Sequence, residues 1–299
     1  MTPMLFATGT LAARIEKAEA EVAAEFAGAA RTRGKDVMLE PIGGTTAVYG
    51  GHGEPFNKIA GLGFRAPLEA HALAALEAKY DARDGEIRVE QSTLADPSVA
   101  IMLTRRGYEL IGYENVLGLA LTPAIVQQMS SRLAEDAAAG VAVARARPDE
   151  VRLWIETVTD GFLQPDTFDG PPPTETFPRE VLLDVYEGFV GLGSSVLYLA
   201  RRGGDVAGGG SLRISDGLAQ LSGAATLQAH RRRGVQSALM RARLVDAAAN
   251  GADIAVVTTE PGSKSQQNVQ RAGFELLYSR AILRRPARSA AGAIGAAAT

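Results

Sequence analysis

The 299-residue sequence contains no cysteine, three histidines and one tryptophan. Without cysteine the chain can form no disulfide, no thiolate nucleophile and no zinc finger. The histidines, His52, His71 and His230, are too far apart to form a metal-binding pair on one helix. Metal catalysis would have to depend on clustered carboxylates, and the sequence shows no such cluster. We therefore expect no bound metal.

Long apolar runs and an excess of one charge sign are also lacking. No segment reaches the roughly 18 consecutive apolar residues of a membrane-spanning helix. The 31 basic and 34 acidic side chains give a net charge of −3, which argues against a surface adapted to nucleic acid or anionic membranes. We expect a cytoplasmic protein with neither partner. The alternative is a nucleic-acid patch at Arg231–Arg233, Arg241 and Arg243, but no aromatic residues alternate with these arginines.

What is present is a periodic pattern typical of a mixed α/β fold, with a mostly antiparallel sheet flanked by helices. We expect strands at residues 37–39, 45–49, 87–89, 108–121, 141–143, 195–200, 205–214, 218–227 and 254–259. Helices are expected at 11–31, 68–80, 97–107, 122–140, 179–189, 234–249 and 263–272, with one more after Pro148 that carries Trp154. The length suggests two domains.

An internal repeat supports the two-domain prediction. At an offset of 166 residues, Leu68–Leu117 aligns with Gly234–Leu283 without a gap. Both segments enter their last strand through a Gly-aromatic-Glu-Leu sequence, which starts at Gly107 in the first and at Gly273 in the second. Two copies of one fold are the economical explanation, and chance similarity of two alanine-rich segments is the alternative.

The segment most indicative of chemistry is Leu227–Leu239, where a strand passes into a helix. The amides of a first helical turn have no partner within the helix and lie at the positive end of its dipole, so they can hold phosphate. Gly234 would let an anion approach the backbone, and the arginines before it raise the local positive potential. The segment therefore predicts an anion site.

This segment resembles the acetyl-CoA signature of the GNAT superfamily of N-acetyltransferases, R/Q-x-x-G-x-G/A, at a strand-to-helix junction. Arg231 and Gly234 fit the signature, whereas Gln236 stands where the family has a small residue. A second likeness is the asparagine-containing helix ending in Gly-Phe, here Ser265–Phe274. Together the two likenesses cover about Val141–Arg285.

The resemblance implies two GNAT-like folds in tandem and an acetyl-CoA site in the second. In such a site the end of the strand pairs with the pantetheine arm, the helix start cradles the pyrophosphate, and the later helix contacts the pantetheine side. The residues implied to bind the cofactor are Ala225, Thr226, Leu227, Arg231, Arg232, Arg233, Gly234, Val235, Gln236, Ser237, Ser265 and Asn268.

The reaction implied is direct attack of a neutral amine on the acetyl thioester. It needs a base for the ammonium, a donor to the thioester carbonyl and an acid for the leaving thiolate. A backbone N–H between the strands ending at Leu227 and Thr259 can serve the carbonyl. Glu260 is the candidate base, with a solvated strand-end carboxylate as the alternative. Many family members carry a tyrosine on this helix that acts as the acid, and Val269 stands at its position here. Tyr278 or Ser265 would have to act as the acid instead.

The first repeat lacks this apparatus. Ala66-Pro67-Leu68 stands opposite Arg232-Arg233-Gly234, and Met102 stands opposite Asn268. We therefore expect a degenerate domain at residues 1–121, a linker helix at 122–140, a catalytic domain at 141–288 and a disordered tail at 289–299. The degenerate domain either shapes the acceptor pocket or mimics a dimer partner, or it only covers apolar surface.

The resulting prediction is an N-acetyltransferase that moves an acetyl group from acetyl-CoA to a small-molecule or peptide amine. The alternatives are a non-catalytic acyl-CoA sensor and a transferase of a larger acyl group. A proline-rich loop with Phe168 is expected to form a wall of the acceptor site, while Trp154 and Phe162 are expected in the core. The assembly is either a homodimer or an intramolecular pseudo-dimer of the two domains.

Overall fold

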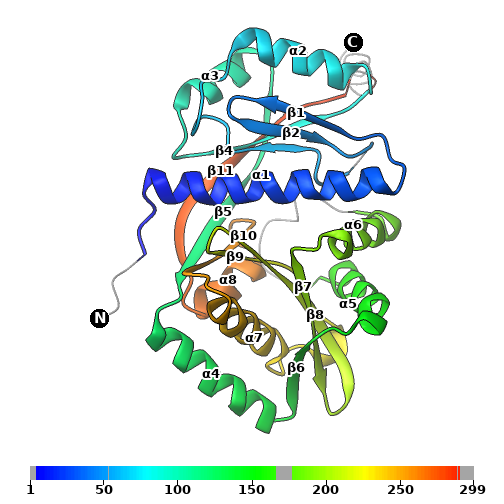
Figure 1. Cartoon of the computed structure of the whole chain (residues 1–299), viewed down its shortest axis with the longest axis vertical. Helices are drawn as coiled ribbons and strands as arrows, with labels where there is room; N and C mark the ends of the chain where they lie inside the picture. The colour runs from blue at the N-terminus through cyan, green and yellow to red at the C-terminus, as the bar shows by residue number, and fades with distance from the viewer. Residues whose placement is uncertain (1–4, 53, 166–176, 288, 290–299) are drawn as a thin grey trace. The chain divides into compact units, whose positions relative to one another are not determined.

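The computed structural model describes residues 5–52, 54–165, 177–287 and 289. The loop that contains Phe168 and most of the terminal segment 289–299 lie outside the described residues. The chain divides into two compact units (Figure 1). Unit 1 contains Met1–Leu5 and Val116–Leu277, and unit 2 contains Phe6–Asn115 and Tyr278–Thr299.

The strands of unit 1 follow one another in the order β11-β5-β10-β9-β8-β7-β6. They are β5 (Glu109–Ala120), β6 (Val141–Arg145), β7 (Ser195–Arg202), β8 (Asp205–Ser215), β9 (Leu218–Thr226), β10 (Ile254–Thr259) and β11 (Glu275–Arg285). Strands β6 to β9 form an antiparallel meander, because Gly203, Gly204, Asp216 and Gly217 adopt the positive φ that tight hairpin turns need. Strand β10 then pairs in parallel with β9.

Helices cover both faces of the unit 1 strands. They are α4 (Pro123–Ala138), α5 (Val151–Leu163), α6 (Arg179–Gly191), α7 (Val235–Ala249) and α8 (Lys264–Arg271), with the short 3-10 turns η1 (Pro148–Glu150) and η2 (Gln228–His230). A side chain at Gly209 would meet Trp154 of α5, whereas one at Gly210 would meet Arg243 of α7. Because successive strand residues point to opposite faces, α5 and α7 lie on opposite faces.

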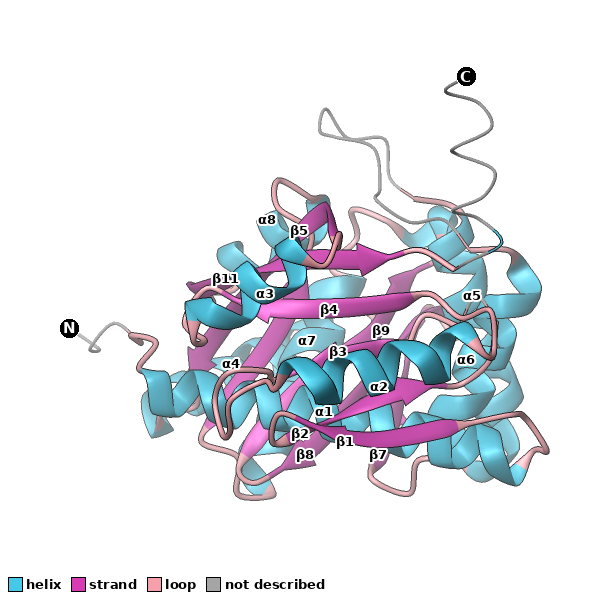
Figure 2. Ribbon diagram, turned by 90° about the horizontal axis from the view of Figure 1, so that it is seen from above, coloured by secondary structure: helices cyan, strands magenta, loops and turns pink. Residues whose placement is uncertain are grey.

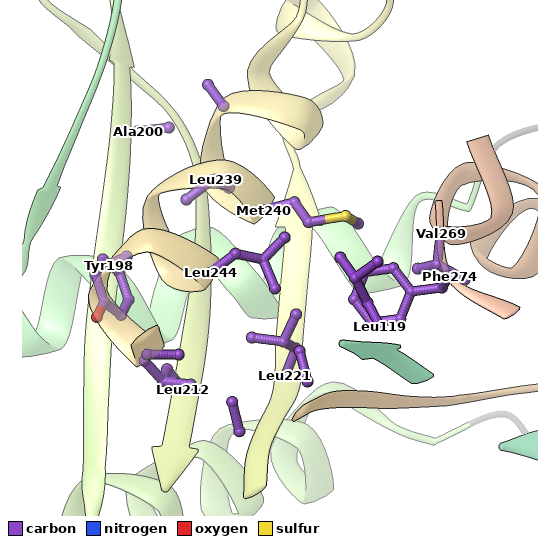
Figure 3. Packing of buried hydrophobic residues seen from close by; sticks show 14 of the residues in the cluster. Leu119, Tyr198, Ala200, Leu212, Leu221, Leu239, Met240, Leu244, Val269 and Phe274 are labelled. Carbon is purple, nitrogen blue, oxygen red and sulfur yellow. The ribbon is translucent and has the colours of Figure 1, made fainter. Parts of the chain in front are cut away.

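The larger hydrophobic cluster of unit 1 lies between α7 and the strands (Figure 3). Leu239 and Leu244 of α7 belong to the same cluster as Leu212 of β8 and Leu221 of β9, and all four are buried. Burying each such leucine contributes roughly 1.5–3 kcal/mol, so this cluster holds α7 against the sheet just after its junction with β9. That junction is the one that the sequence indicated as the anion site.

Unit 2 has the strand order β1-β2-β3-β4-β11-β5. Its own elements are α1 (Gly9–Thr32), β1 (Met38–Ile42), β2 (Thr45–Tyr49), β3 (Lys58–Ala60), α2 (Ala70–Asp81), β4 (Ile87–Ser92) and α3 (Pro97–Arg105). Ala47 and Tyr49 share a cluster with Leu76 of α2, whereas Val48 packs with Ala27 of α1. Helices α1 and α2 therefore cover opposite faces, as Figure 1 shows.

The repeat is confirmed at the level of secondary structure. Helix α2 corresponds to α7, β4 to β10, α3 to α8 and β5 to β11, all at the offset of 166 residues. Strands β3 and β4 are parallel, as their counterparts β9 and β10 are. Short side-chain caps start the paired helices: Asp96 accepts from the Ser98 amide before α3, and Ser263 accepts from the Gln266 amide before α8.

The last strand of each repeat, however, ends in the unit built by the other repeat. Strand β11 pairs antiparallel with β4, with Arg280 opposite Ser92, and its residues from Tyr278 onward belong to unit 2 (Figure 2). In the same way, β5 from Val116 onward belongs to unit 1, where β5 lies next to β10. Each unit is thus completed by a strand from the other repeat.

The compact units consequently divide the chain along different lines from the domains expected at 1–121 and 141–288. Helix α4, expected as a linker, belongs to unit 1, where Ile125, Val126 and Met129 pack against the buried cluster. The mixed α/β prediction is confirmed, since most of the strand pairs are antiparallel and helices flank them. The functional roles expected for the two domains stay predictions.

Candidate functional site

Strands β9 and β10 diverge toward their carboxyl ends. Their parallel pairing runs from Leu218 with Ile254 to Gln220 with Val256, although β9 continues to Thr226 and β10 to Thr259. Beyond the last pair, the edge of β9 that faces β10 lacks a paired strand within the described residues. A ligand with amide groups can pair with such an edge.

A β-bulge in β9 lies at the start of this divergence. Ser211 is opposite Ser222 and Gly209 is opposite Ala225, so Gly223 and Ala224 together face Gly210. Gly223 has a φ of 55°, a left-handed conformation that glycine adopts without strain. The backbone is also closely packed there, since a Cβ at Gly208 would lie 2.6 Å from the Ala225 carbonyl oxygen. Glycine is therefore needed at both positions.

The bulge fixes the direction of one amide. The Ser222 carbonyl oxygen accepts a hydrogen bond of 2.9 Å from Ser211 Oγ on β8. None of the described peptide bonds is cis, and in a trans peptide the N–H points opposite to the C=O. The Gly223 N–H therefore points away from β8, toward the side on which β10 has diverged. It is a backbone donor aimed into the opening between the strands.

The segment between β9 and α7 forms a concave backbone cradle. It runs through η2 and Arg231–Arg233 to Gly234, which is the N-cap of α7. Arg232 and Gly234 both have positive φ, 58° and 80°, and Arg232, Arg233 and Gly234 are exposed. No side chain caps the amides of the first turn of α7. Alternating left-handed residues before an open helix start have the geometry of a nest that can bind an anion. The anion site itself stays a prediction.

Arg231, which the resemblance implies to be a cofactor-binding residue, makes hydrogen bonds within unit 1. Its guanidinium donates to the backbone carbonyls of Thr226 at 3.2 Å, of Gly161 at 3.4 Å and of Gln164. These bonds tie the end of α5 to the end of β9. Because its Nε and Nη2 groups donate to these carbonyls, Arg231 holds the end of β9 that leads into the cradle. The exposed Arg232 and Arg233 are the cations closest in sequence to Gly234.

The basic patch considered as a nucleic-acid site is not a continuous surface. Arg241 forms an ion pair with Asp136 of α4, and the Arg243 side chain is buried. Of the five arginines, Arg232 and Arg233 are the exposed ones that remain. Two exposed arginines suit a small anion better than a nucleic-acid backbone, which needs a longer row of cations.

Buried polar atoms without partners occur at the same edge. Thr226 Oγ1 at the end of β9, Thr259 Oγ1 at the end of β10 and His230 Nδ1 in η2 make no hydrogen bond with the described residues. Leaving a buried hydroxyl unpaired costs roughly 1–3 kcal/mol. A polar ligand in the opening would satisfy these atoms, so the residues present fit a cofactor with amide and phosphate groups. Sequence reasoning missed Thr259 and His230 because orphaned side chains become visible only in the fold.

Helix α8 presents the second part of the expected site. Ser265 is exposed in its first turn, and Asn268 is half-buried, with no hydrogen bond to its side-chain amide among the described contacts. Val269, at the position of the family's tyrosine, is 3% exposed and packs in the unit 1 cluster beside Phe274 (Figure 3). This position faces the core, so a polar acid would be costly to place there.

Glu260 follows β10 directly and is half-buried. Its backbone carbonyl accepts from the Ser263 amide at 3.2 Å, in the turn that leads into α8. The residue is thus fixed at the carboxyl end of the strand that bounds the opening. This position is the one expected for a base acting on a nucleophile between the two strands.

Tyr278 is placed elsewhere, which corrects its expected availability as an acid. Tyr278 belongs to unit 2 and is 5% exposed. Its hydroxyl donates a hydrogen bond to Glu16 Oε1 at 2.8 Å. Arg280 donates to the same oxygen at 2.7 Å. Burial raises the pKa of Tyr278, and the Glu16 carboxylate raises it further. A phenol whose proton is held by a buried carboxylate is a poor acid for a thiolate, so the acid stays unassigned.

The corresponding segment of unit 2 lacks the cradle. Helix α2 begins after Glu69, whose backbone is extended and whose carboxylate stands at the N-cap position. A carboxylate at the positive end of a helix competes with a bound phosphate. Met102 packs against the unit 2 cluster. Its counterpart in unit 1 is Asn268, whose side-chain amide makes no hydrogen bond among the described contacts. That the first repeat holds no CoA stays a prediction.

Two further findings concern metal ions and membranes. Within the described ranges, no group of three or more histidine, cysteine, aspartate or glutamate side chains could hold a metal ion. Among the helices in the described part of the chain, none is both long enough and apolar enough to cross a membrane.

Comparison with known proteins agrees with this geometry. The sequence profile of the acetyltransferase (GNAT) family matches residues 163–274. A GCN5-related N-acetyltransferase from Kribbella flavida is similar in structure, with a TM-score of 0.59 and 18% identity over 89% of this chain and 95% of that one. A GCN5-related N-acetyltransferase from Sphaerobacter thermophilus has a TM-score of 0.51 and 14% identity over 73% of this chain and 67% of that one.

A tandem GNAT protein from the clavulanic acid biosynthesis pathway is similar across both repeats, with a TM-score of 0.52 and 15% identity over 84% of this chain and 83% of that one. No curated protein sequence matches significantly. The structural likenesses, all below 25% identity, establish the fold. The profile match spans the cradle and all of α8. Residues 163–274 therefore form a domain that matches the acetyltransferase (GNAT) family.

Proposed function

We propose that unit 1 is an N-acetyltransferase that moves an acetyl group from acetyl-CoA directly to an amine. One observation carries the proposal: an open anion cradle, a diverging strand pair and three orphaned polar atoms all occur where β9 and β10 end. A cofactor that is anionic at one end and amide-rich along its arm matches this sequence of features. Acetyl-CoA has that chemistry.

The residues would hold the cofactor in two parts. The amides of Arg232–Ser237 would bind the pyrophosphate, because the helix start is uncapped and exposed. The unpaired edge of β9 at Ala225–Leu227 would pair with the amides of the pantetheine arm, and Ser265 and Asn268 would contact the arm from α8. Arg231 supports this surface by fixing the carboxyl end of β9.

The chemistry then needs few groups. Glu260 takes a proton from the acceptor ammonium, directly or through water, and the neutral nitrogen attacks the thioester carbon. The Gly223 N–H stabilises the oxygen that gains charge as the C–N bond forms. The nitrogen, which is cationic after the attack, loses its extra proton to solvent. The C=O bond then re-forms as the C–S bond breaks, and the thiolate leaves with the electrons of the C–S bond and takes up a proton from solvent. Unit 2, which lacks the cradle, would contribute no second cofactor site.

Binding is tested by thermal unfolding with millimolar acetyl-CoA. The wild type should gain several degrees, since a ligand at 100 times its Kd contributes about 2.7 kcal/mol. Gly234→Asp should abolish this gain, because it places a carboxylate among the phosphates. Gly234→Asn is the matched control: asparagine also tolerates the left-handed φ of 80° but adds no charge, so it should keep most of the gain. If acetyl-CoA does not raise the melting temperature of the wild type, the proposal is wrong.

Catalysis is tested by thiol release from acetyl-CoA against a panel of small-molecule and peptide amines. Turnover with any amine separates the transferase from a sensor that binds acyl-CoA without reacting. Comparing acetyl-CoA with butyryl-CoA decides the size of the acyl group. Glu260→Gln should lower turnover at neutral pH by 10²–10⁴-fold, the usual contribution of a general base. Unchanged turnover would remove Glu260 from the mechanism. The acceptor, the oligomeric state and the cytoplasmic location stay predictions.

A further inference from the structure

Arg243 of α7 is a buried cation without a carboxylate partner. Its side chain is 1% exposed, and no ion pair to it occurs among the described residues. Its Nη1 donates to the carbonyl oxygens of Ser211 at 3.1 Å and Ser222 at 3.4 Å, and its Nε donates to that of Leu239 at 3.1 Å. Burying an unpaired charge normally costs several kcal/mol, so a reason for this one is required.

The position of Arg243 relative to the bulge supplies a reason. A Cβ at Gly210 would lie 3.1 Å from the guanidinium carbon, so the cation lies directly against the bulged backbone. Trp154 holds the same glycine from the opposite face, where its indole N–H donates to the Gly210 carbonyl at 3.1 Å. Burial lowers the pKa of Arg243 to about 10, which leaves the guanidinium charged at neutral pH.

We propose that Arg243 is a positioning residue that polarises the peptide between Ser222 and Gly223 and so strengthens the Gly223 N–H as a donor to the thioester oxygen. The carbonyl and the N–H of one peptide share a single delocalised system. A cation on the carbonyl oxygen withdraws electron density from the nitrogen and makes its hydrogen more acidic. Chains of hydrogen bonds strengthen one another in this way in a low dielectric.

The hydroxyl of Ser211 acts on the same carbonyl. It donates to the Ser222 oxygen at 2.9 Å and lies 3.0 Å from Ser222 Oγ. The oxygen of this peptide thus receives two donors on the side of β8, while its N–H is left pointing to the opening. The buried charge acts on the reacting carbonyl through one peptide group and never touches the substrate.

The inference depends on the proposed function, and its test separates the two. Acetyl-CoA labelled with ¹³C at the acetyl carbonyl is bound to the purified full-length protein, and the carbonyl stretch is measured by difference infrared spectroscopy. The bound wild type should show the stretch shifted to lower frequency than in free acetyl-CoA. No binding, or no shift in the wild type, would overturn the site as proposed and not Arg243 alone.

Three substitutions then test the charge. Arg243→Met and Arg243→Gln should each lose most of the shift, whereas Arg243→Lys, which keeps the charge, should retain part of it. The glutamine variant still offers a neutral donor, so a full shift in it would refute the role of the charge. With an amine that the wild type acetylates, kcat should fall about tenfold, or about 1.4 kcal/mol, with KM for acetyl-CoA changed less than twofold.

Arg213 provides the matched control. It is also a buried arginine on the sheet, 4% exposed, and donates to Gln220 Oε1 at 2.7 Å. Arg213→Met should affect stability without moving the carbonyl frequency. If Arg243→Met fails to fold, the glutamine and lysine variants still decide the question. If all three folded variants keep the wild-type frequency, Arg243 has only a structural role and the inference is wrong.

Discussion

Replacing Thr259 by valine should make the ligand-free protein more stable and its binding of acetyl-CoA weaker. Thr259 is 5% exposed at the end of β10, and its hydroxyl makes no hydrogen bond with the described residues. Valine has nearly the same shape and is also branched at Cβ, so the strand conformation should be kept. The substitution removes a buried polar atom without opening a cavity.

The magnitude follows from that orphaned atom. A buried hydroxyl without a partner costs about 1–3 kcal/mol, so Thr259→Val should raise the free energy of unfolding by about 1 kcal/mol or more. If a bound cofactor satisfies the hydroxyl, its loss should weaken binding by about 1 kcal/mol, which is roughly fivefold in Kd. The two effects have opposite signs, which a general packing defect does not produce.

Urea denaturation without ligand gives the free energy of unfolding, and calorimetric titration gives the Kd for acetyl-CoA. Thr159→Val is the matched control, since Thr159 is fully buried on α5 and its hydroxyl is also orphaned. It should stabilise the protein to a similar extent and leave Kd unchanged. If Thr259→Val lowers the free energy of unfolding, or leaves Kd within twofold of the wild type, the hydroxyl is not held for the ligand.

Three further substitutions test other parts of the fold. Burial and the neighbouring Glu90 raise the pKa of Glu114 to about 7, so its stabilising contribution is complete below about pH 4.5 and is lost as the pH rises through 7. Glu114→Gln should flatten this loss, at most about 3 kcal/mol, in urea denaturation at pH 5 and 8. Arg231→Met should lower the free energy of unfolding by about 1–2 kcal/mol, because the carbonyls that it binds lose a charged donor. Gly161→Ala should lower Tm, because its Cβ would lie 2.5 Å from that of Ala225.

Controls distinguish these effects from general damage. Gly28→Ala, in an α1 position where a Cβ meets nothing within 4 Å, should raise stability by about 0.5–1 kcal/mol, opposite to Gly161→Ala. The Glu114 side chain is 29% exposed, so its slope with pH should weaken in high salt. A wild-type stability that is flat between pH 5 and 8 would contradict the account of Glu114. An Arg231→Met protein of unchanged stability would contradict that of Arg231.

Much of the fold could be predicted from the sequence because the signals are local. Asp96 and Pro97 mark the start of α3, and Ser263 marks that of α8, through hydrogen bonds or ring geometry within one turn. The cradle was predictable for the same reason, since Gly234 and the arginines before it adjoin a strand and a helix in sequence. The left-handed φ of Arg232 was not, because arginine has no preference for it.

Functional details that depend on long-range packing could not be predicted. The motif placed Arg231 among the cofactor-binding residues, and it could not show that the folded chain brings three backbone carbonyls within reach of its guanidinium. Arg243 belongs to a basic run in the sequence. In the fold, however, its side chain is buried between α7 and β8. Tyr278 follows Gly273 closely in sequence, but β11 carries it into unit 2. The ungapped repeat identified β5 and β11 as equivalent without showing which neighbours they pair with.

The exchanged last strands have a consequence for the history of the gene. After a duplication, a copy without a cofactor cradle is ordinarily free to be deleted. Here deletion of the first repeat would remove β5 from beside β10 and leave the surviving unit with an exposed strand edge, which invites aggregation. Selection against an exposed edge at β10 is then enough to keep the first repeat, whether or not that repeat binds a ligand.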